Sequence, residues 1–176
     1  MSFLDLAKKR ESCRSYDPTR EVEREKIDTI LVAARLSPSA CNSQPYHLFV
    51  VTGDKRETVA KACMGMGMNP FMKDVSVMMV ITEREYNKTA AFGAKIKHND
   101  YRSIDIGILT ANVTLAAADL DLGTCIIGWF DNKKIGEAIG TEDTVRLVIA
   151  LGYPKENKPP RDKKRKNSDE LFSEIN

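Results

Sequence analysis

Apolar residues along this chain follow two spacings, which predict helices in some segments and strands in others. An i, i+3, i+4 pattern with charged residues between predicts amphipathic helices over residues 2–10 and 25–36. An unbroken apolar run over residues 75–82, rich in valine, predicts a strand buried on both faces. Shorter β-rich runs predict three more strands, at residues 47–52, 125–130 and 144–152.

The longest predicted helix covers residues 102–120 and carries two apolar stripes. One stripe consists of Ile104, Ile108, Ala111, Leu115 and Ala118. The other consists of Leu109, Val113, Ala116 and Leu120. A helix that is apolar on nearly all sides is buried. We therefore expect one stripe to face the core and the other to be covered by a second subunit.

Further helices are predicted at residues 55–63 and near residues 131–139, so helices and strands interleave along the chain. Residues 83–101 are polar and lack a clear period, which indicates an excursion or lid. Two helices precede the first strand, and this order argues against a plain βαβ repeat. We predict an α+β fold (α/β in a three-layer sense) with a central mixed sheet flanked by helices. One domain is expected over residues 1–176, with a basic C-terminal extension from about residue 154.

The composition narrows the class of protein. A chain of 176 residues with 42% hydrophobic residues and a net charge of +2 is too apolar and too weakly charged for disorder. Its apolar runs are far shorter than the roughly 20 residues that a bilayer requires. The first residues place an acid before the bases, unlike a signal peptide, so we expect a cytoplasmic protein. Four widely spaced cysteines and two histidines favour free thiols over a zinc site.

Charge is unevenly distributed along the chain. Residues 154–166 carry seven basic and two acidic side chains, whereas the remainder has a net charge of −3. Such a run is usually a solvated face. A nucleic-acid-binding tail is a second interpretation, but the run has no interleaved aromatic residues and the rest of the chain is acidic.

The chain lacks the glycine-rich nucleotide motifs and hydrolase motifs, and neither histidine is placed as an acid–base partner. We therefore expect a bound cofactor to supply the chemistry. Arg10, Ser12 and Arg14 suit a phosphate, because guanidinium groups form bidentate charge-assisted bonds; they also fit a solvated helix terminus. The polar loop at residues 37–46, held by Pro38 and Pro45, offers further donors and acceptors but also fits an ordinary capped turn.

Five short motifs, taken together and in their order along the chain, resemble those of the nitroreductase family of FMN-dependent oxidoreductases. They are Arg-x-Ser-x-Arg-x-Tyr at 10–16, Ser-Pro-Ser-Ala-x-Asn-x-Gln-Pro-Tyr at 37–46, Leu-Gly-Thr-Cys-Ile-Ile-Gly at 122–128, Leu-Gly-Tyr-Pro at 151–154 and Lys-x-Arg at 163–165. The resemblance covers essentially the whole chain and is weakest at residues 83–101.

The resemblance implies a role for each matching position. The FMN phosphate and ribityl chain would be held by Arg10, Ser12, Arg14, Lys163 and Arg165. The flavin of the partner subunit would be reached by Pro38, Ser39, Asn42 and Gln44. The isoalloxazine ring would lie beside Ile126, Ile127, Gly128 and Trp129, with Asn69 at its pyrimidine edge. Glu11 stands where relatives often carry a basic residue, which weakens the local positive field.

The resemblance also implies a ping-pong oxidoreductase that takes electrons from NADH or NADPH through FMN. Nitroaromatics, quinones or similar small electrophiles would accept them, with no catalytic side chain from the protein. We expect a homodimer with FMN at the subunit interface, and neither nucleic acid nor membrane as a partner. A flavin-binding sensor or store without turnover is the alternative, and a different electrophile is also compatible with the sequence.

Overall fold

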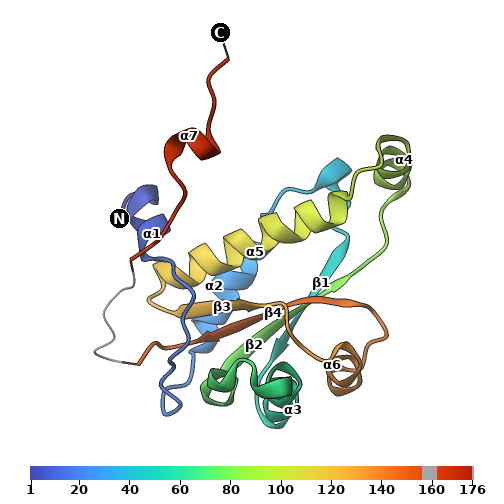
Figure 1. Ribbon diagram of the computed structural model, residues 1–176. Coiled ribbons are helices and arrows are strands. Elements are labelled where there is room, and N and C mark those ends of the chain that lie inside the picture. The colour runs from blue at the N-terminus through green and yellow to red at the C-terminus, as the bar shows by residue number, and fades with distance from the viewer. Residues whose placement is uncertain (156–161, 176) are drawn as a thin grey trace.

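The computed structural model describes residues 1–155 and 162–175. Four strands form one sheet in the order β1-β2-β4-β3 (Figure 1). Their bounds are β1 (Tyr46–Val51), β2 (Val77–Glu83), β3 (Gly123–Ile127) and β4 (Val145–Gly152). The predicted strands are therefore present, each with bounds within two or three residues of those expected.

The described residues also form seven α-helices and three short 3₁₀ turns. The helices are α1 (Phe3–Lys9), α2 (Arg24–Arg35), α3 (Asp54–Cys63), α4 (Lys88–Lys97), α5 (Tyr101–Asp119), α6 (Asn132–Ile139) and α7 (Ser168–Leu171). The turns are η1 (Ala40–Asn42), η2 (Gly65–Gly67) and η3 (Pro70–Asp74). Several starts coincide with capping side chains. Asn87 and Asp100, for example, accept bonds from the first turns of α4 and α5.

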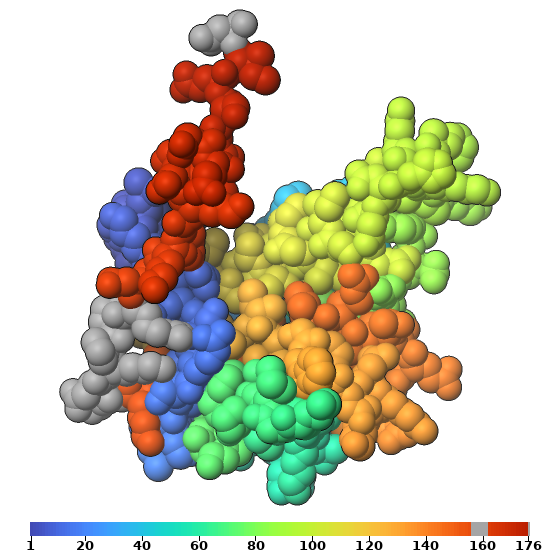
Figure 2. Space-filling model, in the orientation of Figure 1, coloured from blue at the N-terminus to red at the C-terminus, as the bar shows by residue number. Residues whose placement is uncertain are grey.

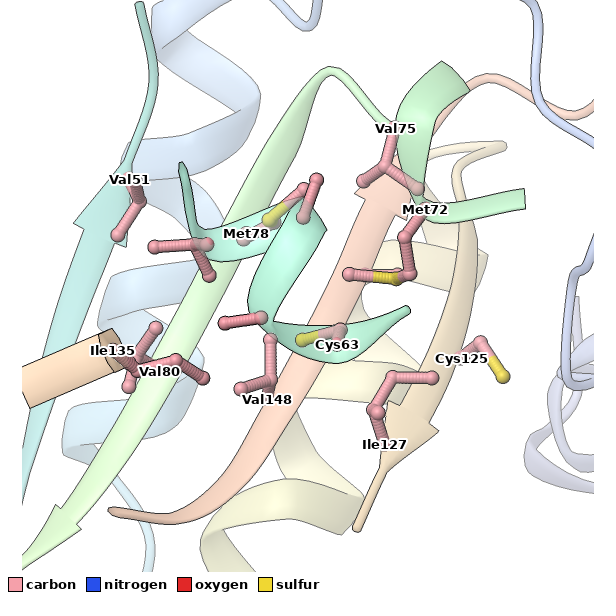
Figure 3. Packing of buried hydrophobic residues seen from close by; sticks show 14 of the residues in the cluster. Val51, Cys63, Met72, Val75, Met78, Val80, Cys125, Ile127, Ile135 and Val148 are labelled. Carbon is pink, nitrogen blue, oxygen red and sulfur yellow. The ribbon is translucent and has the colours of Figure 1, made fainter. Parts of the chain in front are cut away.

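Strand β2 shows why the sheet lies between two helical layers. Val77, Met79 and Ile81 pack on the side of α2 and α5, whereas Met78 and Val80 pack on the side of α3 and α6 (Figure 3). Successive side chains of a strand point to opposite faces, so an unbroken apolar run fills both layers at once. The predicted three-layer α+β class and the doubly buried strand are confirmed.

Strand direction differs from the expected mixed sheet, because every pair of neighbouring strands among the four is antiparallel. The long crossover through α5 brings β3 to the edge of the sheet, and β4 then inserts between β2 and β3. Thus β2 and β3 run in the same direction without pairing. In the described part of the chain, the one parallel bridge joins Ser12, which lies outside the named strands, to Thr124 of β3.

Helix α5 confirms that one of its two apolar stripes faces the core. Leu109 and Val113 are buried in the core. On the opposite stripe, Ile104 is 50% exposed, Ala111 is exposed and Ile108 is only partly covered. Ala118 of the same stripe is buried, and cover of the exposed part by a second subunit stays a prediction.

The region predicted as an excursion contains a helix, α4, which projects from the body beyond the first turn of α5 (Figures 1 and 2). No helix in the described ranges is both long and apolar enough to cross a membrane. The four cysteines are free thiols, as expected, and Cys41 alone among them is exposed. Burial raises the pKa of the Cys63 thiol to about 12, so this side chain is a neutral packing residue at neutral pH.

The extended segment after α1 lies directly on the ends of β3 and β4. The backbone N–H of Cys13 donates to the carbonyl of Thr124 at 2.7 Å, and that of Asp17 donates to Tyr153 at 2.9 Å. A Cβ atom on Gly123 would stand 2.8 Å from the Cβ of Cys13. A Cβ on Gly152 would stand 3.1 Å from the ring of Tyr16. Glycine fits at both positions because neighbouring side chains occupy the space that a Cβ atom would need.

We predict that Gly123→Ala destabilises the protein by about 1–3 kcal/mol, because the added methyl group must displace the Cys13 segment. The matched control is Gly93→Ala in α4, where the added Cβ would meet the Tyr101 ring at an ordinary 3.6 Å. That control should be neutral or slightly stabilising, since alanine favours helix. Urea unfolding measures both; equal midpoints for the two variants would contradict the prediction.

Candidate functional site

A pocket of about 200 Å³ forms where the N-terminal segment meets the residues near the C-terminus. It is lined by Arg10, Glu11, Ser12, Arg14, Asp162, Lys163, Lys164 and Arg165. The structure thus brings together the two groups of residues that the sequence assigned to a phosphate, although about 150 positions separate them. We call this the basic pocket.

The spacing of Arg10, Ser12 and Arg14 follows from the local backbone. Helix α1 ends at Lys9, the following Arg10 has extended φ and ψ, and Ser12 then pairs with Thr124 in a bridge. In an extended chain, every second side chain points to the same side. All three therefore line the basic pocket, while Cys13 between them is buried against the sheet. The segment is a strand-like edge rather than the helix end that the sequence suggested.

Lys163 has a role that the sequence did not reveal. Its ammonium donates to the carbonyl oxygens of Ala7, Lys8 and Arg10, at 2.6, 2.5 and 2.6 Å. These three bonds use all the donors of the ammonium group, at the C-terminal end of α1 where carbonyls lack helical partners. Burial lowers the pKa of Lys163, and the charges of Arg10 and Arg165 lower it further. Lys163 therefore fastens the C-terminal segment to α1 and contributes only its charge to the basic pocket.

The net charge of the basic pocket suits a phosphate. Five cationic side chains face two acidic ones, Glu11 and Asp162. Arg10 and Ser12 are half-buried, whereas Arg14 and Arg165 are exposed. Guanidinium groups and a hydroxyl are the donors that phosphate oxygens accept from most readily. Within the described residues no group of side chains is arranged to bind a metal ion.

Strand β3 leads from the basic pocket to an apolar surface. It begins beside Ser12, and its last residues lie roughly 10 Å farther along the strand. Ile127 is buried, whereas Ile126 and Trp129 are 45% and 49% exposed. Gly128 has open space where a side chain would be. The four predicted ring-contacting residues therefore form a strand end with a bare backbone, flanked by exposed apolar groups.

The methionine-rich turn after α3 borders this apolar surface. Trp129 donates from its indole nitrogen to the carbonyl of Gly65 at 3.1 Å, and Met66 and Met68 are exposed nearby in sequence. Asn69 adopts a left-handed conformation and donates from its side-chain amide to the carbonyl of Cys63 at 3.1 Å. Its amide nitrogen thus stabilises the turn, and the contact of Asn69 with a flavin stays a prediction.

The polar loop between α2 and β1 is compact and internally bonded. We call residues 39–44 the αβ loop. The Ser39 hydroxyl accepts from the backbone of Gln44 at 3.0 Å, and the Gln44 amide donates to the Asn42 side chain at 3.0 Å. Cys41, Asn42 and Gln44 all have positive φ angles near 50°. Such conformations are rare for residues other than glycine and are concentrated at binding sites.

Within one chain, the αβ loop lies far from the basic pocket. The loop is bonded to Asp105 near the start of α5, whose carboxylate accepts from the backbone of Ala40 at 3.0 Å. Arg10 shares a cavity with Ala118 at the end of the same helix. Thirteen residues of helix separate these two points, which corresponds to about 20 Å. Pro38, Ser39, Asn42 and Gln44 are therefore not brought together with Arg10 and Arg165 in a single subunit.

Comparison with known proteins identifies the family. The model of the nitroreductase family matches residues 7–68 and 65–153. The chain belongs to the nitroreductase family. A Methanothermobacter thermautotrophicus protein, provisionally named NADH dehydrogenase/NAD(P)H nitroreductase, is 32% identical over 92% of this chain and 82% of its own length.

Solved nitroreductase structures share the fold. An FMN-dependent nitroreductase from Clostridium difficile R20291 is 28% identical, covers 96% of this chain and 94% of its own, and superposes with a TM-score of 0.72. A nitroreductase family protein from Streptococcus pneumoniae TIGR4 reaches a TM-score of 0.82 at 23% identity, over 99% of this chain and 100% of its own. At that lower identity the second likeness concerns the fold alone.

Two polar residues that bond to the αβ loop were not identified from the sequence. Asn87 precedes α4 and bonds to the αβ loop, and Asp105 interrupts an apolar stretch of α5. Both left a signal. Asparagine before a helix is a preferred N-cap, and an acid between Ile104 and Ile106 needs a buried partner.

We predict that Lys163→Met loosens the C-terminal segment without unfolding the core. The substitution keeps the apolar stem but removes the donor to three carbonyls, so amides of the described residues 162–167 should exchange with solvent about tenfold faster. Lys164→Met is the matched control, because Lys164 is the next residue along the chain and its side chain is exposed. Hydrogen exchange measured by mass spectrometry tests this; equal protection in the two variants would refute it.

Proposed function

We propose that this protein is an FMN-dependent oxidoreductase that uses NADH or NADPH to reduce nitroaromatics, quinones or similar electrophiles. One observation carries the proposal: a phosphate-sized basic pocket is joined by β3 to an exposed apolar strand end, in the order that an elongated flavin nucleotide requires. The names of the Methanothermobacter and Clostridium difficile relatives support it, since they specify NAD(P)H and FMN respectively.

The donor set fits the phosphate and the ring of FMN. Arg10, Ser12, Arg14 and Arg165 would hold the phosphate, with the charge of Lys163 behind them. Ile126 and Trp129 would contact the flat ring, and the open face of Gly128 leaves room for it. An edge strand also carries backbone N–H groups that no neighbouring strand uses, which suits polar edges of a heterocycle.

When bound, FMN supplies the capacity to accept a hydride and to pass electrons on, which side chains lack. The residues of this chain would bind and orient the cofactor and exclude water from one side of the ring. Neither His47 nor His98 lines the basic pocket. This arrangement agrees with an enzyme that needs no acid or base of its own.

A second subunit completes the proposed site. The αβ loop lies about 20 Å along α5 from the basic pocket, so Asn42 and Gln44 can reach the same flavin only from another copy. The stripe of α5 that includes the exposed Ile104 and the partly covered Ile108 is an apolar surface suited to that contact. We therefore propose a homodimer with FMN at the interface.

The absorption spectrum of the purified protein tests the function. We expect a yellow protein that takes up FMN, loses its visible flavin band on addition of NADH or NADPH without oxygen, and regains it with a nitroaromatic or quinone. Arg165→Ala and Arg10→Ala should each weaken FMN binding by about 1.5–3 kcal/mol, the range for bonds to charged groups.

Lys166→Ala is the control for the arginine variants, because Lys166 is exposed and lies outside the basic pocket. Wild-type protein that binds no FMN would refute the proposal, and unchanged affinity in both arginine variants would refute the phosphate assignment. Bound flavin that neither nicotinamide bleaches would instead identify a flavin store or sensor.

The interface is tested by Ile108→Glu, which places a charge on the exposed stripe. We expect a shift from dimer to monomer in sedimentation velocity and, because the site is then incomplete, at least a tenfold loss of FMN affinity. Ile108→Val keeps the surface apolar and should remain dimeric. A monomeric glutamate variant with wild-type FMN affinity would show that one subunit suffices.

A further inference from the structure

Asn87 connects the projecting helix α4 to the αβ loop through two hydrogen bonds. Its side-chain amide donates to the carbonyl of Cys41 at 2.9 Å, and its backbone N–H donates to the Ser43 hydroxyl at 2.8 Å. Its side-chain oxygen accepts from the backbone of Ala90 at 2.9 Å and caps α4. The N-cap residue of the projecting helix is thus bonded twice to the loop that we assign to the flavin.

The αβ loop needs external support to keep its conformation. Three non-glycine residues of the loop have positive φ, and such strain persists only where surrounding structure enforces it. Bonds inside the loop join Ser39, Asn42 and Gln44. Among the described residues, Asp105 and Asn87 supply side-chain bonds to the loop backbone from outside it.

The two supports differ in how closely the rest of the fold surrounds them. Asp105 is 2% exposed on a helix packed against the sheet, so it holds Ala40 from the rigid part of the fold. Asn87 holds Cys41 from a helix that projects away from the body, as Figure 2 shows for the yellow-green segment. On α4, Ala90 is buried, whereas Phe92 is 68% exposed and Ile96 55% exposed.

We propose that Asn87 is a positioning residue that makes α4 and the αβ loop move as one unit. A displacement of α4, such as contact of a flat apolar substrate with Phe92 or Ile96 would produce, must carry Cys41 and Ser43 with it or break two hydrogen bonds. Asn42 lies between those two residues, so the displacement reaches a side chain assigned to the flavin. This inference rests on the proposed function for its flavin, but the coupling itself is a property of the protein without cofactor.

Asn87→Asp separates the two roles of this residue. Aspartate still caps α4, because it keeps the oxygen that accepts from Ala90, but it cannot donate to Cys41 and places a carboxylate against that carbonyl. Asn87→Ser also keeps a capping oxygen, lacks the donor, and adds no charge. Asn99→Asp is the matched control, since it makes the same charge change at an exposed position beyond the other end of α4.

Two measurements test the proposal. In protein without cofactor, hydrogen exchange at residues 40–44 should be about three- to tenfold faster in Asn87→Asp and Asn87→Ser than in wild type or Asn99→Asp, while exchange within α4 stays unchanged. In FMN titrations, the dissociation constant should rise about three- to tenfold for the two Asn87 variants only.

Each of the other outcomes contradicts one part of the proposal. Unchanged exchange in the loop means that Asn87 does not hold it, and faster exchange with unchanged FMN affinity means that the support does not position a flavin contact. Faster exchange throughout α4 means that the variants have lost the helix rather than the coupling. If wild-type protein binds no FMN, the proposed function fails together with the positioning role, whereas the exchange result still decides the coupling.

Discussion

Close backbone contact between the extended segment 10–16 and the ends of β3 and β4 is the interaction on which the site depends. Gly123 and Gly152 make this contact possible, because each stands where a side chain would collide with Cys13 or Tyr16. Once the segment lies there, alternation of an extended chain turns Arg10, Ser12 and Arg14 to one side. Lys163 then holds the end of α1 against the C-terminal segment. Four of the five sequence motifs are thus parts of one packing arrangement, which explains their joint presence.

Elements with strong local signals were predictable from the sequence. The strand around Val80 was identifiable because an unbroken apolar run must be buried on both sides, and α5 because two stripes follow its period. The convergence of Arg10 with Arg165 came only through resemblance to the family, since no local pattern links positions that far apart. The basic pocket confirms that these residues meet; what they bind stays a prediction.

Other features depended on contacts that a sequence pattern does not encode. The sheet was expected to be mixed, but insertion of β4 between β2 and β3 makes every neighbouring pair antiparallel. Lys163 was grouped with the phosphate ligands, yet the free carbonyls at the end of α1 occupy its donors. Helix α4 was missed because its apolar residues include exposed ones, Phe92 and Ile96, which blur the periodicity of a helix packed on a core.

The length of α5 has a consequence for how such a protein behaves in a cell. This helix separates the αβ loop from the basic pocket of the same chain by about 20 Å. In the proposed homodimer, cofactor binding and subunit association are therefore linked equilibria, and each one favours the other by mass action. Apparent cofactor affinity would then rise with protein concentration. A scarcely expressed chain would remain empty at a flavin level that fills an abundant one, so the amount of protein would itself regulate how much of it is active.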